Sequence, residues 1–285
     1  MHQSEMYCRC VDELRSFADG IGFSDVVLGL SGGMDSSIVA VMCADAFGRD
    51  RVHGVLMPGP YSSDHSVEDA HALAAALGIE TCTVPIAGAF SAFEEALAEP
   101  CGGALAGIAA ENTQARCRMV CLMALSNTYG WMLVNTGNRS EAAMGYSTLY
   151  GDTAGAFAPI GGLYKTDVYA LARWRNEQAL LGAQPVGRGW RADVTDEAPI
   201  PERVFLKPPS AELSPDQEDE TSLGIDYVML DRVLVAACEQ GRSAAAIARD
   251  SGLDLAFVES LLARVDAFAY KRALEPPFPR AAFYA

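Results

Sequence analysis

A serine- and glycine-rich stretch near the start of the chain has the residue types and spacing of a phosphate-binding turn. Residues 29–37 read Gly-Leu-Ser-Gly-Gly-Met-Asp-Ser-Ser. A glycine turn between a buried strand and a helix leaves backbone N–H groups unpaired and pointing in one direction, which suits phosphate. No Gly-Lys-Ser/Thr follows, so this is not a Walker A loop. From these residues alone, a packing turn with Asp35 as an ordinary helix-start residue remains the alternative.

The segments around this turn predict the elements that position it. Residues 26–28, Val-Val-Leu, form the short apolar run of a buried parallel strand. After Asp35 the apolar residues recur at three- and four-residue intervals, which predicts a helix. The remaining pattern predicts strands near 52–57, 80–85 and 131–134, and helices over 4–20, 66–77, 87–98 and 111–129. This alternation predicts an α/β fold, a doubly wound parallel sheet flanked by helices, with ligands at the carboxyl ends of the strands.

Composition limits the classes of partner. The 285 residues, half of them hydrophobic, suit a single domain over 1–285. A net charge of −16 argues against nucleic acid as the principal partner, because no basic surplus can neutralise its phosphates. No run of about 18 apolar residues predicts a membrane span, and the first residues lack a signal pattern, so we expect a cytoplasmic protein.

The eight cysteines contain no Cys-x-x-Cys pair. Several of them fall in predicted helices or strands. We therefore expect buried thiols rather than a zinc site or a disulfide framework.

Several later blocks follow in an order that points to a family. They are residues 111–119 (ENTQARCRM), 135–141 (NTGNRSE), 145–152 (GYSTLYGD), 158–169 (APIGGLYKTDVY), 207–213 (KPPSAEL) and 270–272 (YKR). The early loop resembles the pyrophosphate loop of the N-type ATP pyrophosphatases. The whole ordered set resembles NAD synthetase over roughly residues 5 to 275, and the blocks at 148–152 and 158–161 are most similar to the synthetase half of its glutamine-dependent branch.

This resemblance implies a reaction. ATP would adenylate the nicotinate carboxylate of deamido-NAD, pyrophosphate would leave, and ammonia would displace AMP to give NAD. Mg²⁺ would be the metal cofactor and ATP a co-substrate. Such chemistry depends mainly on orientation and charge neutralisation.

The resemblance also implies the ATP-binding residues. Asp35 and Lys165 would be catalytic, since Asp35 would bind Mg²⁺ and Lys165 would neutralise the phosphates. Without the resemblance, Lys165 is predicted to be an exposed helix-start lysine and Thr136 a structural strand-end threonine. The full predicted set is Gly29, Leu30, Ser31, Gly32, Gly33, Met34, Asp35, Ser36, Ser37, Thr136, Lys165 and Ser210.

For the dinucleotide, the resemblance implies Asn112, Arg116, Glu141 and Lys271. Arg116 suits a phosphate because its planar fork donates two parallel hydrogen bonds, although a weak pairing within its helix is the alternative. Glu141 would also be the second metal ligand beside Asp35. Its alternative is a solvent-facing carboxylate at a helix N-terminus.

The remaining expectations concern the second half of the chain. Residues 182–220, rich in Gly, Pro and acidic side chains, predict a lid loop that would keep water from the acyl-adenylate. Residues 226–271 predict C-terminal helices. In the family, such helices and those near 112–130 form a homodimer interface.

Three departures from the family leave alternatives open. We expect no glutaminase domain before residue 1, so ammonia would arrive free or from a separate glutaminase. Asn135 stands where the family usually has glycine and would re-shape the pocket, and the basic tail of the branch is absent. A related amide ligase acting on another carboxylate, or a non-catalytic nucleotide-binding subunit of an amidotransferase, are the alternatives. Retention of Asp35, Glu141 and Lys165 argues against a silent subunit.

Overall fold

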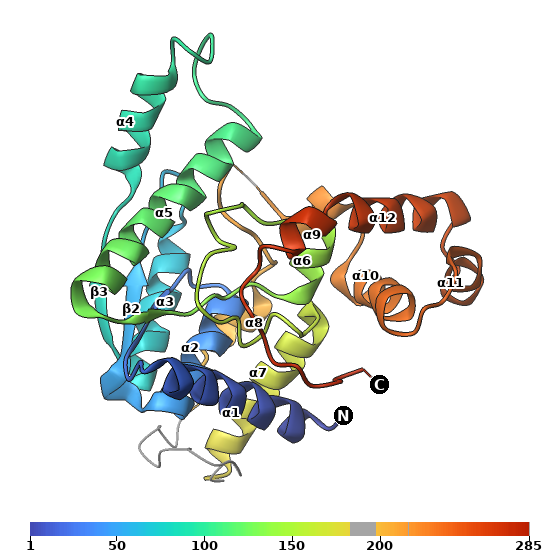
Figure 1. Ribbon diagram of the computed structural model, residues 1–285, viewed down its shortest axis with the longest axis horizontal. Coiled ribbons are helices and arrows are strands. Elements are labelled where there is room, and N and C mark those ends of the chain that lie inside the picture. Colours follow the sequence, from blue (N-terminus) through green and yellow to red (C-terminus); the bar gives the residue numbers. More distant parts are fainter. Residues whose placement is uncertain (183–197, 216, 285) are drawn as a thin grey trace.

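A computed structural model describes residues 1–182, 198–215 and 217–284 (Figure 1). The described residues form a parallel sheet in the order β3-β2-β1-β4, from β1 (Val26–Gly29), β2 (Val52–Leu56), β3 (Glu80–Thr83) and β4 (Met132–Leu133). Val26 of β1 pairs with Val52 on one side and with Met132 on the other. Because every pairing is parallel, the carboxyl ends of the strands share one edge of the sheet.

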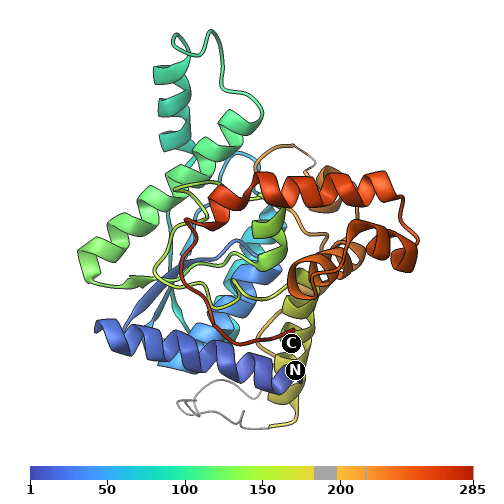
Figure 2. The same cartoon turned by 45° about the vertical axis from the view of Figure 1, so that its right-hand side comes forward.

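Helices connect and flank these strands. They are α1 (Gln3–Ile21), α2 (Met34–Phe47), α3 (Asp64–Leu77), α4 (Ala87–Leu97), α5 (Ile108–Tyr129), α6 (Arg139–Met144) and α7 (Lys165–Leu180), with a 3₁₀ turn, η1, at Arg49–Arg51. Figures 1 and 2 both show α4 and the first turns of α5 projecting from the body. The two chain ends lie near each other in both views.

The two faces of the sheet pack against different helices, because alternate side chains of a strand point to opposite faces. Val26 and Leu28 belong to a core shared with α1, α2 and α7. Val27, between them, belongs to a second core with α4 and α5. Helix α2 is buried on nearly every side, which explains why its sequence is apolar or small all round. The loop before α2 is therefore held on a rigid support.

The described chain after α7 adds further helices: α8 (Glu202–Leu206), α9 (Asp219–Leu223), α10 (Tyr227–Leu234), the π turn η2 (Val235–Glu239), α11 (Ala244–Ser251), α12 (Leu255–Ala267) and α13 (Ala269–Arg272). Of these, α10, α11 and α12 lie on the right of Figure 1, whereas α8 lies near the centre of the view. A third core joins α10, α11 and α12 to Met144 of α6 and to Tyr164. These helices therefore pack directly on the element that carries Glu141.

The predicted α/β fold is confirmed. Helix α5 begins at Ile108, three residues before the predicted start, and the strand ladder at 131–134 is limited to Met132–Leu133. No helix in the described ranges is both long enough and apolar enough to cross a bilayer.

The expectation of buried thiols is wrong for three of the eight free cysteines, since Cys82, Cys101 and Cys238 are exposed. Cys82 lies on β3, the edge strand, and most of the residues of this strand face solvent. Cys10, which lies near the N-terminus, is buried.

Candidate active site

A cavity of about 320 Å³ lies at the carboxyl edge of the sheet. The ends of β1, β2 and β4 and the first turns of α2 and α6 contribute to its walls. Most of the predicted ATP-binding residues line it: Gly29, Leu30, Ser31, Gly33, Met34, Asp35, Ser36, Thr136, Lys165 and Ser210. Of the described loop residues in that prediction, Gly32 and Ser37 are not part of the lining.

The loop before α2 is shaped by its own side chains. The Ser36 and Ser37 hydroxyls donate to the Gly33 carbonyl oxygen at 3.2 and 2.8 Å. Gly32 has a φ of +76°, and a Cβ atom there would overlap the carbonyl oxygen of Ser66. Only glycine fits this turn without strain. Phosphate binding by the Ser36 and Ser37 hydroxyls stays a prediction.

Three charged side chains meet at the foot of this loop. The Lys165 ammonium donates to the carboxylates of Asp35 and Glu141, with a distance of 2.9 Å from Nζ to Glu141 Oε1. The side chain of Lys165 is only 4% exposed. The interpretation of Lys165 as an exposed helix-start lysine is therefore wrong, because two segments far away in the sequence bury it between two carboxylates.

Burial and the oppositely charged neighbours shift the pKa values of Lys165 and Glu141 in opposite directions. Burial alone would lower the pKa of Lys165, but the two adjacent carboxylates outweigh it and hold that pKa well above its ordinary value. Burial raises the pKa of Glu141 above its ordinary value, because the Lys165 ammonium offsets only part of the desolvation and Asp35 adds a like charge. Lys165 is thus a permanent cation, and Glu141 would become more acidic if a second cation arrived.

The two carboxylates are positioned by a residue that the prediction missed. Asn138 is the N-cap of α6, and its side-chain oxygen accepts from the Glu141 backbone N–H at 3.0 Å. Its Nδ2 donates to Asp35 Oδ1 at 3.2 Å. A buried amide therefore links the helix that carries Glu141 to Asp35. An asparagine three residues before a glutamate is a helix-cap signal that could have identified it.

Lys165 is fixed by buried groups that the prediction also missed. The Ser140 hydroxyl accepts from the Lys165 backbone N–H at 2.9 Å and donates to Asp231 of α10. Asp231 also accepts from the Thr166 N–H at 2.8 Å, so its carboxylate caps the first turn of α7. Asp231 lies inside a predicted helix and carries no local sequence signal.

Asn135 precedes Thr136 in the sequence, and both residues line the cavity. Asn135 holds the part of the wall formed by Asp152 and Ala154. Its side-chain amide donates to the backbone carbonyls of Asp152 and Ala154 at 2.7 and 2.9 Å, and its oxygen accepts from the Gly137 N–H. Asp152 also lines the cavity, and burial raises its pKa to about 6. The side chain that replaces the family glycine thus anchors the segment that carries Asp152.

Three predicted substrate residues gather around residues 145–149 and do not line the cavity, as far as the described chain shows. Asn112 accepts from the Thr148 hydroxyl at 2.7 Å, and Arg116 donates to the Leu149 carbonyl at 3.2 Å. Lys271 donates to the carbonyls of Gly145 and Ser147 at 2.8 and 2.6 Å. Glu141, the fourth, does line the cavity.

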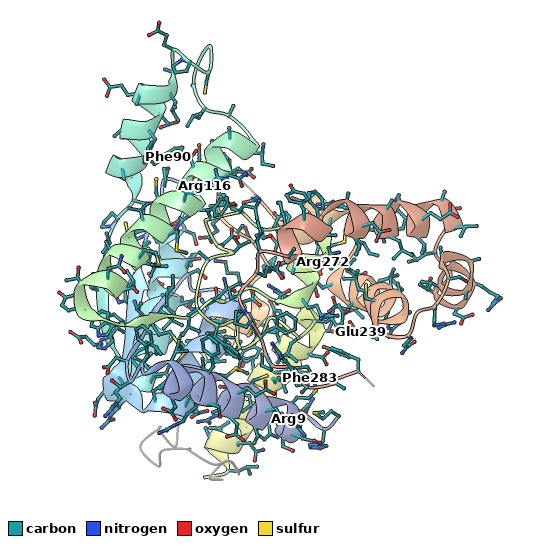
Figure 3. All side chains as sticks on the ribbon, in the orientation of Figure 1. Arg9, Phe90, Arg116, Glu239, Arg272 and Phe283 are labelled. Atoms are coloured by element: carbon teal, nitrogen blue, oxygen red, sulfur yellow. The ribbon has the colours of Figure 1, made fainter. Side chains whose placement is uncertain are left out.

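The C-terminal end of α6 is capped by cations. Arg264 donates to the Met144 carbonyl at 3.0 Å, and Arg272 donates to the Ala143 carbonyl at 3.2 Å. Arg272 is labelled in Figure 3 where α13 meets α6. Together with Lys271 they satisfy carbonyl groups at the negative end of the helix.

Residues 207–213 also line the cavity. Ser210 lies in this segment, and its hydroxyl donates to the Gln217 carbonyl. Of the predicted lid loop, residues 183–197 and residue 216 lie outside the described residues.

The residues present fit a hard divalent cation. In the described chain no group of three His, Cys, Asp or Glu side chains is arranged to hold a metal. Mg²⁺, however, is commonly held by one or two carboxylates together with water and substrate phosphates. Asp35 and Glu141 supply two carboxylates, and the Lys165 ammonium between them shows that this position accepts positive charge.

A parallel sheet with a glycine–serine loop at its carboxyl edge, facing a buried lysine, defines a nucleotide-binding α/β protein. Residues 6–275 match the NAD synthase family, and the chain therefore belongs to that family. The resemblance inferred from the ordered blocks is confirmed.

The chain is 44% identical over 272 residues to the glutamine-dependent NAD(+) synthetase of Thermotoga maritima, a match that covers 95% of this chain and 44% of that protein. It thus spans less than half the length of the curated relatives it matches. It is also similar to the structure of the NH₃-dependent NAD synthetase of Campylobacter jejuni, with 27% identity, a TM-score of 0.71 and coverage of 95% and 96% of the two chains. The NMN synthetase of Francisella tularensis matches with 25% identity, a TM-score of 0.71 and coverage of 94% and 96%.

Proposed function

We propose that this chain amidates deamido-NAD to NAD at the expense of ATP, with ammonia as the nitrogen donor. The observation that carries the proposal is the Lys165 ammonium, buried between Asp35 and Glu141 beside the early loop, in a chain of the NAD synthase family. A carboxylate is a poor acyl donor at neutral pH. It must first be joined to a good leaving group, and a cavity with a fixed cation beside a phosphate-binding turn suits that step.

In the first step, a carboxylate oxygen of the substrate attacks the α-phosphorus of ATP. The bond from this phosphorus to the oxygen that bridges to the β-phosphorus breaks, and pyrophosphate leaves with the electron pair. Backbone N–H groups of residues 31–36 would hold the departing pyrophosphate. Lys165 would neutralise the negative charge that develops, and Thr136 and Ser210 would contact ATP from two walls of the cavity.

In the second step, ammonia attacks the acyl carbon, the bond from this carbon to the AMP oxygen breaks, and the nitrogen loses a proton to give the amide. Asp35 and Glu141 would hold Mg²⁺, which when bound would neutralise phosphate charge. The walls of the cavity would keep water from competing with ammonia.

For the dinucleotide, we propose Asn112, Arg116, Glu141 and Lys271 as binding residues. The first two lie on α5, and with Lys271 they surround residues 145–149. Their hydrogen bonds to backbone and hydroxyl groups could be exchanged for substrate contacts at small net cost.

We further propose that one domain over 1–285 assembles as a homodimer through α5. Val120 and Tyr129 on this helix are 66% and 60% exposed, and Ile108 at its start is 72% exposed. Exposed apolar side chains gathered on one helix are typical of protein interfaces. A separate glutaminase would be an alternative source of ammonia.

A second candidate is the amidation of a related carboxylate, nicotinate mononucleotide. The similarity to the NMN synthetase of Francisella tularensis over almost the whole chain favours it. The two candidates differ only in the size of the carboxylate substrate.

The test is a set of reactions with the purified chain, ATP, Mg²⁺ and ammonium, with either deamido-NAD or nicotinate mononucleotide as the carboxylate. We expect NAD, AMP and pyrophosphate in equal amounts, and only when every component is present. Product from the mononucleotide alone would support the second candidate, and no product from either would refute both. Glutamine in place of ammonium should support no turnover unless a glutaminase is added.

A further inference from the structure

The carboxylate of Glu212 reaches from the segment 207–213 to the N-terminus of α3. It accepts from the Ser66 hydroxyl at 2.7 Å and from the Ser63 hydroxyl and backbone N–H at 3.0 and 3.3 Å. The ammonium of Lys207 donates to the same carboxylate at 2.6 Å. Three of these four hydrogen bonds join residues almost 150 positions apart in the sequence, and the fourth comes from Lys207 of the same segment.

Several features make this contact specific. Ser63 is the N-cap of α3, where the helix dipole favours a negative charge. Burial would raise the pKa of Glu212, but Lys207 and the serine hydroxyls outweigh it and hold that pKa below its ordinary value. Glu212 also has a φ of +49°, a backbone conformation that a non-glycine residue adopts only when its surroundings stabilise it.

The segment 207–213 is held at one further point, and Gln217, shortly after it, is held at another. The carbonyl of Leu213 accepts from the side chain of Gln114, a fully buried residue of α5, at 2.9 Å. The side chain of Gln217 donates to the Tyr146 hydroxyl at 3.1 Å. The segment and Gln217 are therefore held against α3, α5 and Tyr146, which follows α6. Among these contacts, charged side chains take part in the α3 anchor, where Glu212 and Lys207 of the segment meet the hydroxyl groups of Ser63 and Ser66.

The α3 anchor also touches the early loop. Gly32 packs so closely on the Ser66 carbonyl that no Cβ atom would fit between them, and Ser66 donates its hydroxyl to Glu212. Release of Glu212 would thus free the segment at the point where it meets the proposed pyrophosphate site.

We propose that Glu212 is a positioning residue that latches residues 207–213 over the cavity and so protects the acyl-adenylate from water. The inference rests on the proposed function, because only an activated acyl group needs this protection. In this role Glu212 contacts neither the α-phosphorus of ATP nor the acyl carbon of the substrate. It acts by keeping Ser210 and the rest of the segment in place.

The test compares Glu212→Gln with Glu218→Gln. Both remove one negative charge from the same region, but the Glu218 side chain is exposed and accepts only from Thr221 nearby, as the described contacts show. The ratio of AMP to NAD formed is measured at limiting ammonium, when the adenylate must wait for its nucleophile. A charge-assisted hydrogen bond can shift an open–closed equilibrium about tenfold, so we expect Glu212→Gln to raise this ratio at least about threefold. Glu218→Gln should leave it unchanged.

Amide hydrogen exchange supplies a readout that does not depend on turnover. In Glu212→Gln the backbone amides of Lys207 and of residues 210–213 should exchange faster than in the wild type, and those of the sheet should not change. Ser66→Ala should show the same change, and the double variant should add little to it. An unchanged AMP-to-NAD ratio or unchanged exchange in Glu212→Gln would overturn the latch. Failure of the wild type to form NAD would refute the proposed function, and the exchange measurement would still decide whether the latch exists.

Discussion

The two sides of the candidate site are built differently. On the adenylation side, the buried Lys165 ammonium donates to both Asp35 and Glu141, whose side chains are 19% and 20% exposed. On the proposed dinucleotide side, Arg116 and Lys271 are charged but donate to backbone carbonyls of residues 145–149. The charged groups of the first set pair with one another, whereas the cations of the second set pair with backbone carbonyl groups of one loop.

The difference indicates where each side gains its specificity. Taking a lysine and two carboxylates out of water costs free energy that their mutual attraction repays only in part. Such a cluster fits a site that must meet phosphate charge with fixed groups. Hydrogen bonds to backbone carbonyls are exchangeable, which suits a surface that orders when a large substrate binds.

The largest expected effect tests the fixed side. Asp35→Asn keeps the size of the side chain but removes a charge from the cluster and from the proposed Mg²⁺ site. We expect a fall in kcat/KM on the order of 10³-fold in NAD formation. Circular dichroism and thermal unfolding should show a folded protein. Activity within tenfold of the wild type would mean that Asp35 has no metal role.

A smaller effect is expected on the exchangeable side. Lys271→Met should raise the KM for the dinucleotide about 10- to 100-fold, the loss expected for a charge-assisted contact, with less change in kcat. Arg272→Met is the matched control, because Arg272 caps the Ala143 and Val265 carbonyls at the same junction. If Lys271 serves only as a cap, both variants will lose thermal stability and neither will change KM selectively.

The link between Asp35 and α6 can be weakened without loss of the helix cap. Asn138→Ser keeps an oxygen for the Glu141 N–H but removes the donor to Asp35, and should lower kcat about 2- to 10-fold. Asn138→Ala should lose the cap as well and cost about 1 kcal/mol of folding stability. Equal kcat values for Asn138→Ser and the wild type would show that the hydrogen bond to Asp35 does not matter for catalysis.

The smallest effect concerns stability and pH. The folded state raises the pKa of Asp152 from 3.8 to about 6, so folding favours its protonated form, and this stability is lost as the pH rises through about 6. Asp152→Asn cannot ionise. Because Asp152 is an exposed residue and solvent screens its charge, the gain of this variant in unfolding free energy over the wild type should grow by less than about 1 kcal/mol between pH 5 and pH 8. Urea unfolding at the two pH values measures this, and an equal gain at both would show that Asp152 does not titrate there.

The sheet and the early loop could be predicted because their signals are local. Val26 to Leu28 form an apolar run, and the glycines that follow leave few conformations other than a turn. The environment of Lys165 could not be predicted this way. Its burial depends on Asp35, 130 residues earlier, and no spacing rule connects them.

The missed residues show the same limit. Asn138 had a local signal, as a cap before Glu141. Asp231 had none, because its contacts with Ser140 and Thr166 exist only when α10 packs against α6 and α7. Contacts such as those of Asp231 arise from tertiary packing, which the periodicity of the sequence does not specify.

Helix α6 has a mechanical consequence. It has six residues and is about 9 Å long, with no interior at which it could bend. Its first turn carries Glu141 and is tied to Asp35, and the cations of α12 and α13 grip its last carbonyls. A shift of α13 would therefore move the whole helix as a rigid strut. Binding of a ligand at one end of α6 would therefore displace the groups at the other end.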